Sequence, residues 1–140
     1  MLTKVTFRLA GYDAALTAAA VTRRLGLQPA AAFEADTPVS RRKPPRTRGY
    51  SLWLISSSPH VEPDVGVGEH LRRLLAILEP VTAPLWELAG AGYEANWYCF
   101  AASHATEHAM ELDRPILKRL LALPGDLWLD VCGDGSGDPQ

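Results

Sequence analysis

Strand-like and helix-like segments alternate along nearly the whole chain, and this order limits the fold more than any single motif does. Residues 4–9 (Lys-Val-Thr-Phe-Arg-Leu) alternate polar and apolar side chains, which predicts a strand with one buried face. Asp13 is placed to cap a following helix, and that helix is expected to end at Leu25, because a glycine, an apolar residue and a proline follow it. The chain therefore begins with a strand and a helix.

The same patterns continue to the end of the chain. They predict strands at 30–36 (short), 50–56, 93–102 and 126–132. They also predict a helix at 68–79, which Pro80 kinks or ends and a second helical piece continues. A further helix is predicted at 114–123, with Asp113 as its cap. This order predicts an α+β fold with a mixed four- or five-stranded sheet packed against helices. A ferredoxin-like layout is one arrangement that fits. We expect a single domain over 1–132 and a disordered tail at 133–140, which holds only Gly, Asp, Ser, Pro and Gln.

The composition and the first residues of the chain limit the class and the cellular location that we expect for the protein. Hydrophobic residues make up 47% of the sequence and charged residues 21%, which is ordinary for a soluble globular protein. The uninterrupted apolar runs are too short for a membrane span, and the first residues show no signal peptide. Two cysteines, Cys99 and Cys132, are too few for a disulfide framework. A cytoplasmic location is expected, with no membrane association and no cofactor.

Basic residues gather in one proline-rich loop. Five of the fourteen lie within eight positions: Arg41, Arg42, Lys43, Arg46 and Arg48. The rest of the chain then carries nine basic residues against sixteen acidic ones. Such a loop is either a solvated connection or a contact for an acidic partner or a phosphate. The basic residues form no wider face interleaved with aromatic residues, which argues against nucleic-acid binding.

A set of short segments resembles one known family. The segments are Phe7 to Gly11, Leu25 to Pro29, Ser51 to Trp53, Glu69 to Leu71 with the leucines up to Pro80, and Leu129 to Val131. In this order and spacing they resemble the bacterial family known as domain of unknown function 4279, over most of residues 4–132. The chain departs from the family's pattern at 33–36, where a glycine turn is typical, and at Cys132, where an aromatic residue is common. The resemblance implies an architecture and no mechanism.

One stretch matches a catalytic signature. His104, Glu107 and His108 spell H-x-x-E-H, which on a helix would present two zinc ligands with Glu107 as the base of a hydrolase. The third ligand of such enzymes is a glutamate far downstream. The one glutamate that follows His108, Glu111, would lie on the same helix face, about 10 Å from His104 along the axis. The stretch is thus either a metal site or a polar surface loop between a strand and the next helix.

The remaining candidate residues lie on predicted strands. Trp53, Trp97 and Trp128 are predicted to line one face of the sheet together, either as core or as a partner-binding surface. Asp130 interrupts an apolar strand, so it is either a site acid, and with that a candidate partner-binding residue, or an outward-facing residue or loop cap. The serines at 56–58 and the cysteines form no recognisable nucleophile arrangement, and no glycine-rich phosphate loop is present in the sequence.

These features favour a non-enzymatic module that binds another protein through the aromatic sheet face or the basic loop. An immunity- or antitoxin-like role is one form of such a function. Two alternatives stay open: a metal-dependent hydrolase that uses the H-x-x-E-H stretch, and a domain that binds a small ligand between sheet and helices. A homo-oligomer is compatible with each of them.

Overall fold

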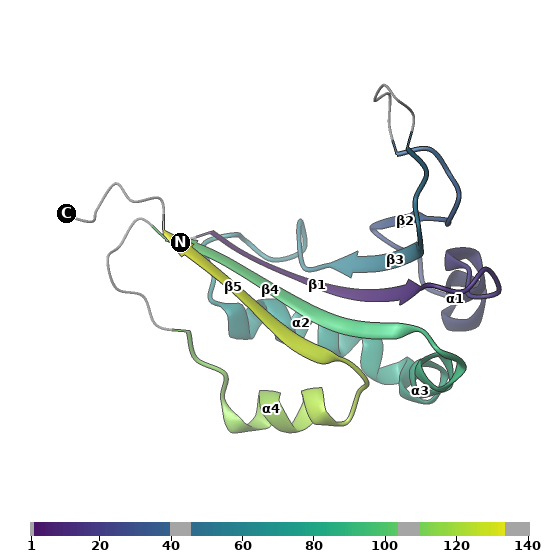
Figure 1. Cartoon of the computed structure of the whole chain (residues 1–140). Helices are drawn as coiled ribbons and strands as arrows, with labels where there is room; N and C mark the ends of the chain where they lie inside the picture. Colours follow the sequence, from purple (N-terminus) through teal and green to yellow (C-terminus); the bar gives the residue numbers. More distant parts are fainter. Residues whose placement is uncertain (1, 40–45, 104–109, 134–140) are drawn as a thin grey trace.

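A single mixed sheet with helices on one side organises the chain (Figure 1). The computed structural model describes residues 2–39, 46–103 and 110–133. The strands are β1 (Leu2–Gly11), β2 (Ala31–Phe33), β3 (Ser51–Ser56), β4 (Glu94–Ser103) and β5 (Asp126–Gly133). The helices are α1 (Ala18–Leu25), α2 (Val67–Leu78), the 3-10 turn η1 (Glu79–Val81), α3 (Thr82–Ala91) and α4 (Arg114–Leu121). The predicted α+β class is confirmed. Gly133 belongs to β5, and the rest of the predicted tail lies outside the described residues.

The strand order is β2-β3-β1-β4-β5, with β1 in the centre. Strand β1 runs antiparallel to both β3 and β4, while β5 runs parallel to β4. Strands β3 and β4 are therefore parallel to each other on either side of β1, and α2, η1 and α3 connect them. This is the split β-α-β unit of ferredoxin-like layouts. The connection from β4 through α4 to β5 is a second β-α-β unit, between neighbouring strands.

The core lies between the sheet and the helices, which cover its lower face in Figure 1. The sheet contributes Phe7, Leu9, Trp53, Trp97 and Cys99, all at most 1% exposed. Helix α2 contributes a stripe of fully buried leucines at helical spacing: Leu71, Leu74, Leu75 and Leu78. Burial raises the pKa of the Cys99 thiol to about 12, so this cysteine is a packing residue.

The segment Val67–Ala91 is long enough, and over part of its length apolar enough, to cross a membrane by length and composition alone. In the fold, however, it is not one continuous α-helix. Pro80 lies within η1, where it separates α2 from α3. The apolar side of α2 packs against the sheet, and a core helix of this kind also passes a test based on composition. Core packing therefore accounts for the apolar side of α2.

Helix α1 begins later than its sequence predicts. The cap is Thr17, whose hydroxyl accepts a hydrogen bond from the Ala20 amide. Asp13 instead accepts from the Ala15 amide within the preceding turn. The Glu34 carboxylate, from the segment after β2, accepts from the Ala18 amide at 2.6 Å and the Ala19 amide at 3.1 Å. A carboxylate at a helix N-terminus stabilises the helix there. The prediction of Asp13 as the cap is wrong, because Thr17 is the residue that caps the helix.

The turn before α1 packs directly on the end of β1, so we predict that position 11 does not tolerate a side chain larger than that of glycine. A Cβ atom at this position would overlap the Leu16 carbonyl oxygen and lie 2.7 Å from the Leu16 Cβ. We expect Gly11→Ala to lower the free energy of unfolding by about 1–3 kcal/mol, because the turn must move. Gly90→Ala is the control: nothing lies within 4 Å of its Cβ position, and alanine favours its helix. Urea unfolding that shows equal stability for the two variants would contradict this account.

Candidate functional site

The sheet face opposite α2, α3 and α4 has no helix over it in the described part of the chain (Figure 1). We call this surface the open face. The strand registers place these side chains on it, in order from β2 to β5: Phe33, Leu52, Leu54, Lys4, Arg8, Asn96, Tyr98, Phe100, Trp128 and Asp130. It therefore combines aromatic, aliphatic and charged side chains on one rigid support.

Arg8 lies at the centre of the open face. Its guanidinium carbon is 5.3 Å from the centroid of the Tyr98 ring, in a cation–π arrangement. One of its terminal nitrogens lies 3.5 Å from the Asn96 side-chain oxygen. Its Nε atom is buried and has no hydrogen-bond partner among the described residues. Packing against Tyr98 thus holds the Arg8 side chain against the sheet.

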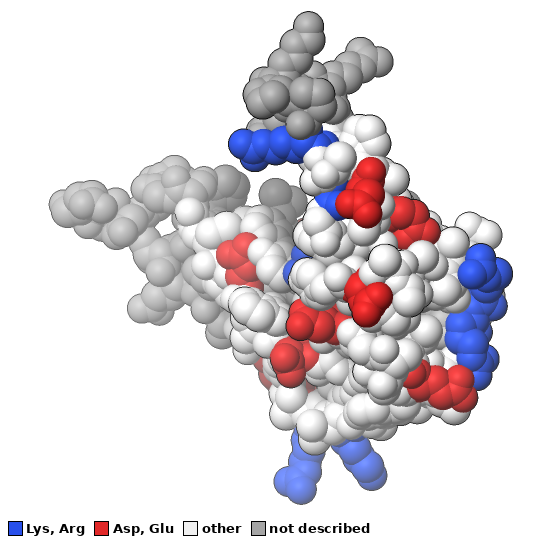
Figure 2. All heavy atoms as spheres, turned by 45° about the vertical axis from the view of Figure 1, so that its right-hand side comes forward, with Lys and Arg blue, Asp and Glu red and all other residues white. Residues whose placement is uncertain are grey.

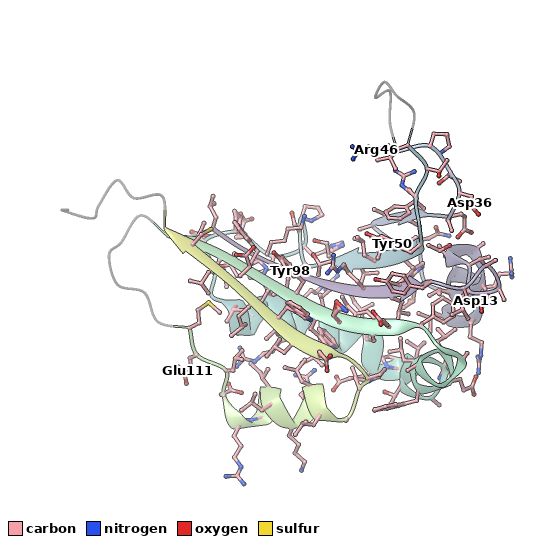
Figure 3. All side chains as sticks on the ribbon, viewed as in Figure 1. Asp13, Asp36, Arg46, Tyr50, Tyr98 and Glu111 are labelled. Carbon is pink, nitrogen blue, oxygen red and sulfur yellow. The ribbon has the colours of Figure 1, made fainter. Side chains whose placement is uncertain are left out.

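Tyr98 joins this arginine to strand β5. Its hydroxyl donates a short hydrogen bond to the Asp130 carboxylate, and this bond is the main reason why the pKa of Tyr98 is raised. Figure 3 shows Tyr98 on the side of the sheet away from the helices. The Asp130 side chain is therefore an outward-facing residue of the open face, as one of its two interpretations predicted. Sequence reasoning singled out neither Arg8 nor Tyr98.

The three tryptophans do not share a face, so that prediction is wrong. Trp97 pairs with Phe7, and Trp53 pairs with Leu9, which places both rings in the core at 1% and 0% exposure. Trp128 pairs with Tyr98 instead, so it lies on the open face and is 58% exposed. Of the tryptophans predicted to bind a partner, Trp128 alone is accessible there.

An arm formed by residues 34–39 and 46–50 rises beside the open face (Figure 1). Its two sides are held together by a bridge between Pro38 and Thr47. The Arg48 guanidinium carbon lies 4.3 Å from the centroid of the Phe33 ring, and Tyr50 packs against the same ring. The other predicted members of the basic cluster are Arg46, which is exposed, and Arg41, Arg42 and Lys43, which lie outside the described residues. Arg48 is thus a structural part of the arm.

A serine and a histidine that the sequence did not connect meet in the interior. Ser57 and His70 are both 0% exposed. The Ser57 hydroxyl accepts from the Val5 amide and lies 2.6 Å from His70 Nδ1, while His70 Nε2 lies 3.0 Å from the Glu62 carbonyl. A carbonyl only accepts, so Nε2 carries the proton and Nδ1 accepts from Ser57. Burial lowers the pKa of His70. The pair is closed to solvent and joins α2 to the sheet, so it is structural.

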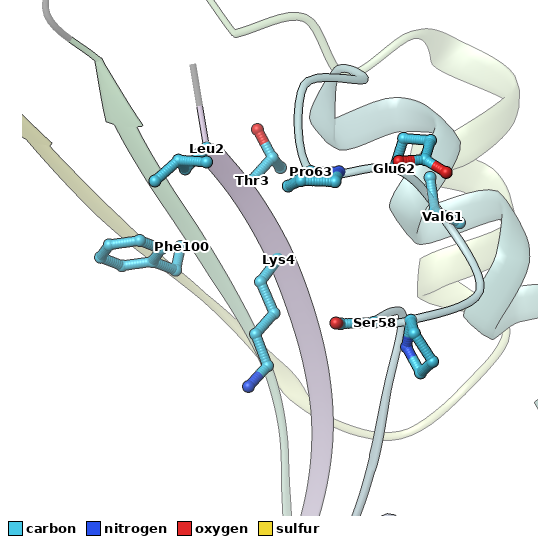
Figure 4. Close-up of a pocket in the computed structure, with 9 residues that line it drawn as sticks. Leu2, Thr3, Lys4, Ser58, Val61, Glu62, Pro63 and Phe100 are labelled. Atoms are coloured by element: carbon cyan, nitrogen blue, oxygen red, sulfur yellow. The ribbon is translucent and has the colours of Figure 1, made fainter.

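A pocket of about 430 Å³ lies beside the first residues of β1 (Figure 4). The Ser58 hydroxyl points toward this strand. The Thr3 hydroxyl is buried without a hydrogen-bond partner in the described structure. The lining combines one cation, one carboxylate and apolar groups: Lys4, Glu62, Leu2, Thr3, Ser58, Pro59, Val61, Pro63 and Phe100. The lining pairs no serine with a histidine, and the small-ligand hypothesis stays a prediction.

The predicted zinc ligands His104 and His108, with the predicted base Glu107, lie outside the described residues. Within 2–39, 46–103 and 110–133, no group of three or more His, Cys, Asp or Glu side chains is arranged to hold a metal ion. The metal hypothesis therefore stays a prediction, and the geometry on which we build comes from the open face.

Comparison with known proteins identifies a family for the whole described fold. No curated protein and no solved structure matches the chain. The family model for domain of unknown function DUF4279 matches residues 1–133, which include every strand and helix described above. The predicted family resemblance is confirmed, and the chain belongs to the DUF4279 family.

Proposed function

We propose that this protein is a non-enzymatic module that binds another protein through its open face. The observation that carries the proposal is the group formed by Arg8, Tyr98 and Trp128 on adjacent strands. Arginine, tyrosine and tryptophan are the residue types most enriched at the energetic centres of protein interfaces. Here they lie on strands, which hold them in fixed positions without a loss of loop entropy on binding.

The charges around this group favour a protein over a nucleic acid. Acidic side chains lie at the β4–β5 side of the open face, at Glu94, Asp126 and Asp130, whereas Lys4 and Arg8 lie on the central strand. Figure 2 brings the end of the molecule with α1 and α3 forward, and there too acidic side chains occupy the middle of the visible surface while basic ones lie toward its margins. A nucleic-acid site needs a continuous basic face. A protein partner can match alternating charges and cover the exposed Trp128 ring.

An immunity- or antitoxin-like role is the form of this function that we favour. In that role the open face would bind a toxin and cover its functional surface. We place the module in the cytoplasm as part of the same proposal. Cys99 and Cys132 are both free thiols, as a reducing compartment favours. Recovery of a toxin as the bound partner would support this narrower role.

Affinity capture with two surface variants tests the proposal. Trp128 is 58% exposed on the open face, whereas Arg73 is exposed on α2, on the other side of the sheet. We expect the wild type and Arg73→Ala to retain the same protein from a lysate of the source organism. Trp128→Ala should lose it, with an affinity for the purified partner at least about 30-fold weaker by calorimetry. Equal affinities for the two variants would refute the role of the open face.

A further inference from the structure

Strand β5 forms one edge of the sheet, and its outer side pairs with no other strand of the described chain. Seven of its eight residues are exposed. Edge strands are usually protected from unwanted pairing by charged side chains, above all lysine, or by proline, a bulge or short length. The β5 sequence, Asp-Leu-Trp-Leu-Asp-Val-Cys-Gly, has neither lysine nor proline and is longer than an average strand. Its two charged residues, Asp126 and Asp130, both lie on the open face, and the helix side of the strand carries no charge. This edge is therefore open to pairing with another strand.

Exposed apolar side chains concentrate along the same edge. Nine large apolar side chains of the described residues are exposed, and six belong to α4 and β5: Leu117, Leu121, Leu127, Trp128, Leu129 and Val131. On α4, Arg119 bonds to Glu79 at the end of α2. At 100° per residue, Leu117 and Leu121 lie on the opposite flank of the helix, away from α2. A concentration of this kind on one side of a molecule marks an interaction surface.

We propose that β5 pairs in an antiparallel arrangement with β5 of a second copy of this chain. A twofold axis perpendicular to the sheet would join the two sheets into one and keep the helices of both copies on the same face. The α4 helices would then meet below the joined strands and cover Leu117 and Leu121. A lone peptide strand would satisfy the backbone of β5 but leave both leucines exposed. A second copy supplies a strand and an apolar helix together.

The charges on β5 select one register for this pairing. A twofold axis perpendicular to the sheet keeps each side chain on its own face, so directly opposite residues of the two strands share a face. One residue of β5 therefore lies at the axis, opposite its own copy. With Leu129 on the axis, Asp130 lies opposite Trp128, and Asp126 lies opposite Cys132. Shifting the axis to Trp128 places Asp126 opposite Asp130, and shifting it to Asp130 places that carboxylate opposite itself. Like charges in directly opposite positions are destabilising. Registers centred on Leu127 or Val131 keep the carboxylates apart but pair fewer residues of β5. Charge and paired length together therefore place Leu129 on the axis.

Sedimentation equilibrium over a range of protein concentrations tests the dimer. The wild type should approach twice the 15.2 kDa of the single chain. Leu129→Asp places two carboxylates on the axis and should remain at 15.2 kDa. Tyr12→Asp is the matched control, because Tyr12 is 61% exposed just beyond the end of β1, and it should dimerise as the wild type does. A wild-type protein that stays monomeric at every concentration would overturn the proposal. This holds even if the β5 edge then binds a different protein.

Disulfide trapping tests the register and does not depend on the folding of Leu129→Asp. Directly opposite residues of antiparallel strands have Cα atoms about 4.5–5.5 Å apart, within the range that a disulfide spans. Asp126→Cys should form a disulfide-linked dimer with Cys132 of the second copy under mild oxidation. Positions 126 and 132 of one strand are about 20 Å apart, so they cannot join within one copy. Trp128→Cys reports the two rejected registers, because position 128 lies opposite Cys132 when Asp130 is on the axis and opposite its own copy when Trp128 is. It should not link. Linkage of Trp128→Cys alone, or of neither variant, would overturn the register.

Discussion

Trp97→Ala is expected to lower the free energy of unfolding by about 3–5 kcal/mol, the usual loss for a large aromatic residue removed from a core. The Trp97 ring is 1% exposed and lies edge-on to Phe7, with 4.8 Å between the ring centroids. Its indole N–H donates to the Pro124 carbonyl in the turn before β5. A small domain has only about 5–15 kcal/mol of stability. Guanidinium unfolding should therefore show a large fall in the midpoint.

Trp128→Ala is the natural control for that variant. The Trp128 ring lies one strand away but on the other face of the sheet and is 58% exposed. Its removal should change the free energy of unfolding by no more than about 0.5 kcal/mol. A loss of stability for Trp128→Ala as large as that for Trp97→Ala would mean that the assignment of the two faces is wrong. The pair thus separates a core residue from a surface residue of the same type.

Those elements of the fold that depend on neighbouring residues could be predicted from the sequence. Gly26 ends α1 in the left-handed conformation, with φ of 68°, and Asp113 caps α4 through the Ile116 amide. Pro80 separates α2 from α3. Each of these signals acts within about four residues of the chain. The start of α1 differs from its prediction because two local candidates compete: Thr17, rather than Asp13, caps the helix, and Glu34, sixteen residues beyond Ala18, adds a further acceptor there.

The candidate site was harder to predict, because it depends on which strands become neighbours. Strand β5 carries apolar residues at both parities, such as Trp128 and Leu129, so its periodicity does not say which side faces the core. The register with β4 decides this, and it places Leu129 rather than Trp128 on the helix side. The alternation at 4–9 does place Arg8 on the polar side of its strand. Its contact with Tyr98 follows only when β4 is known to lie beside β1.

The Ser57–His70 pair could not be recognised for a similar reason. The two residues are thirteen positions apart and belong to a loop and a helix. Serine and histidine are common in loops and at the ends of helices, and nothing in their spacing requires contact. The sheet brings Val5 to the same point, where its amide donates to the Ser57 hydroxyl. Three segments of the chain thus meet at one buried polar contact, and its loss should have a large effect.

Acidification is expected to destabilise the protein through His70. Burial lowers the pKa of His70 in the folded state below its ordinary value of 6.5. The unfolded chain therefore binds a proton at this residue at a higher pH than the folded protein does. The free energy of unfolding falls as the pH drops below about 6.5, and the stabilisation is fully present above that value. A protonated Nδ1 can also no longer accept the hydrogen bond from the Ser57 hydroxyl, which would then need another acceptor in the interior.

Urea unfolding of two histidine variants between about pH 7.5 and pH 5.5 tests this origin, since the ordinary pKa of histidine lies within that range. His70→Gln should be less stable than the wild type at pH 7.5 by about 1–3 kcal/mol, because the amide cannot reproduce both buried hydrogen bonds. It should also lose much of the dependence on pH. His60→Gln is the control, because His60 is exposed, and it should keep both the stability and the pH dependence of the wild type. If His70→Gln retains the full wild-type dependence on pH, then a group other than His70 binds the proton that links unfolding to acid.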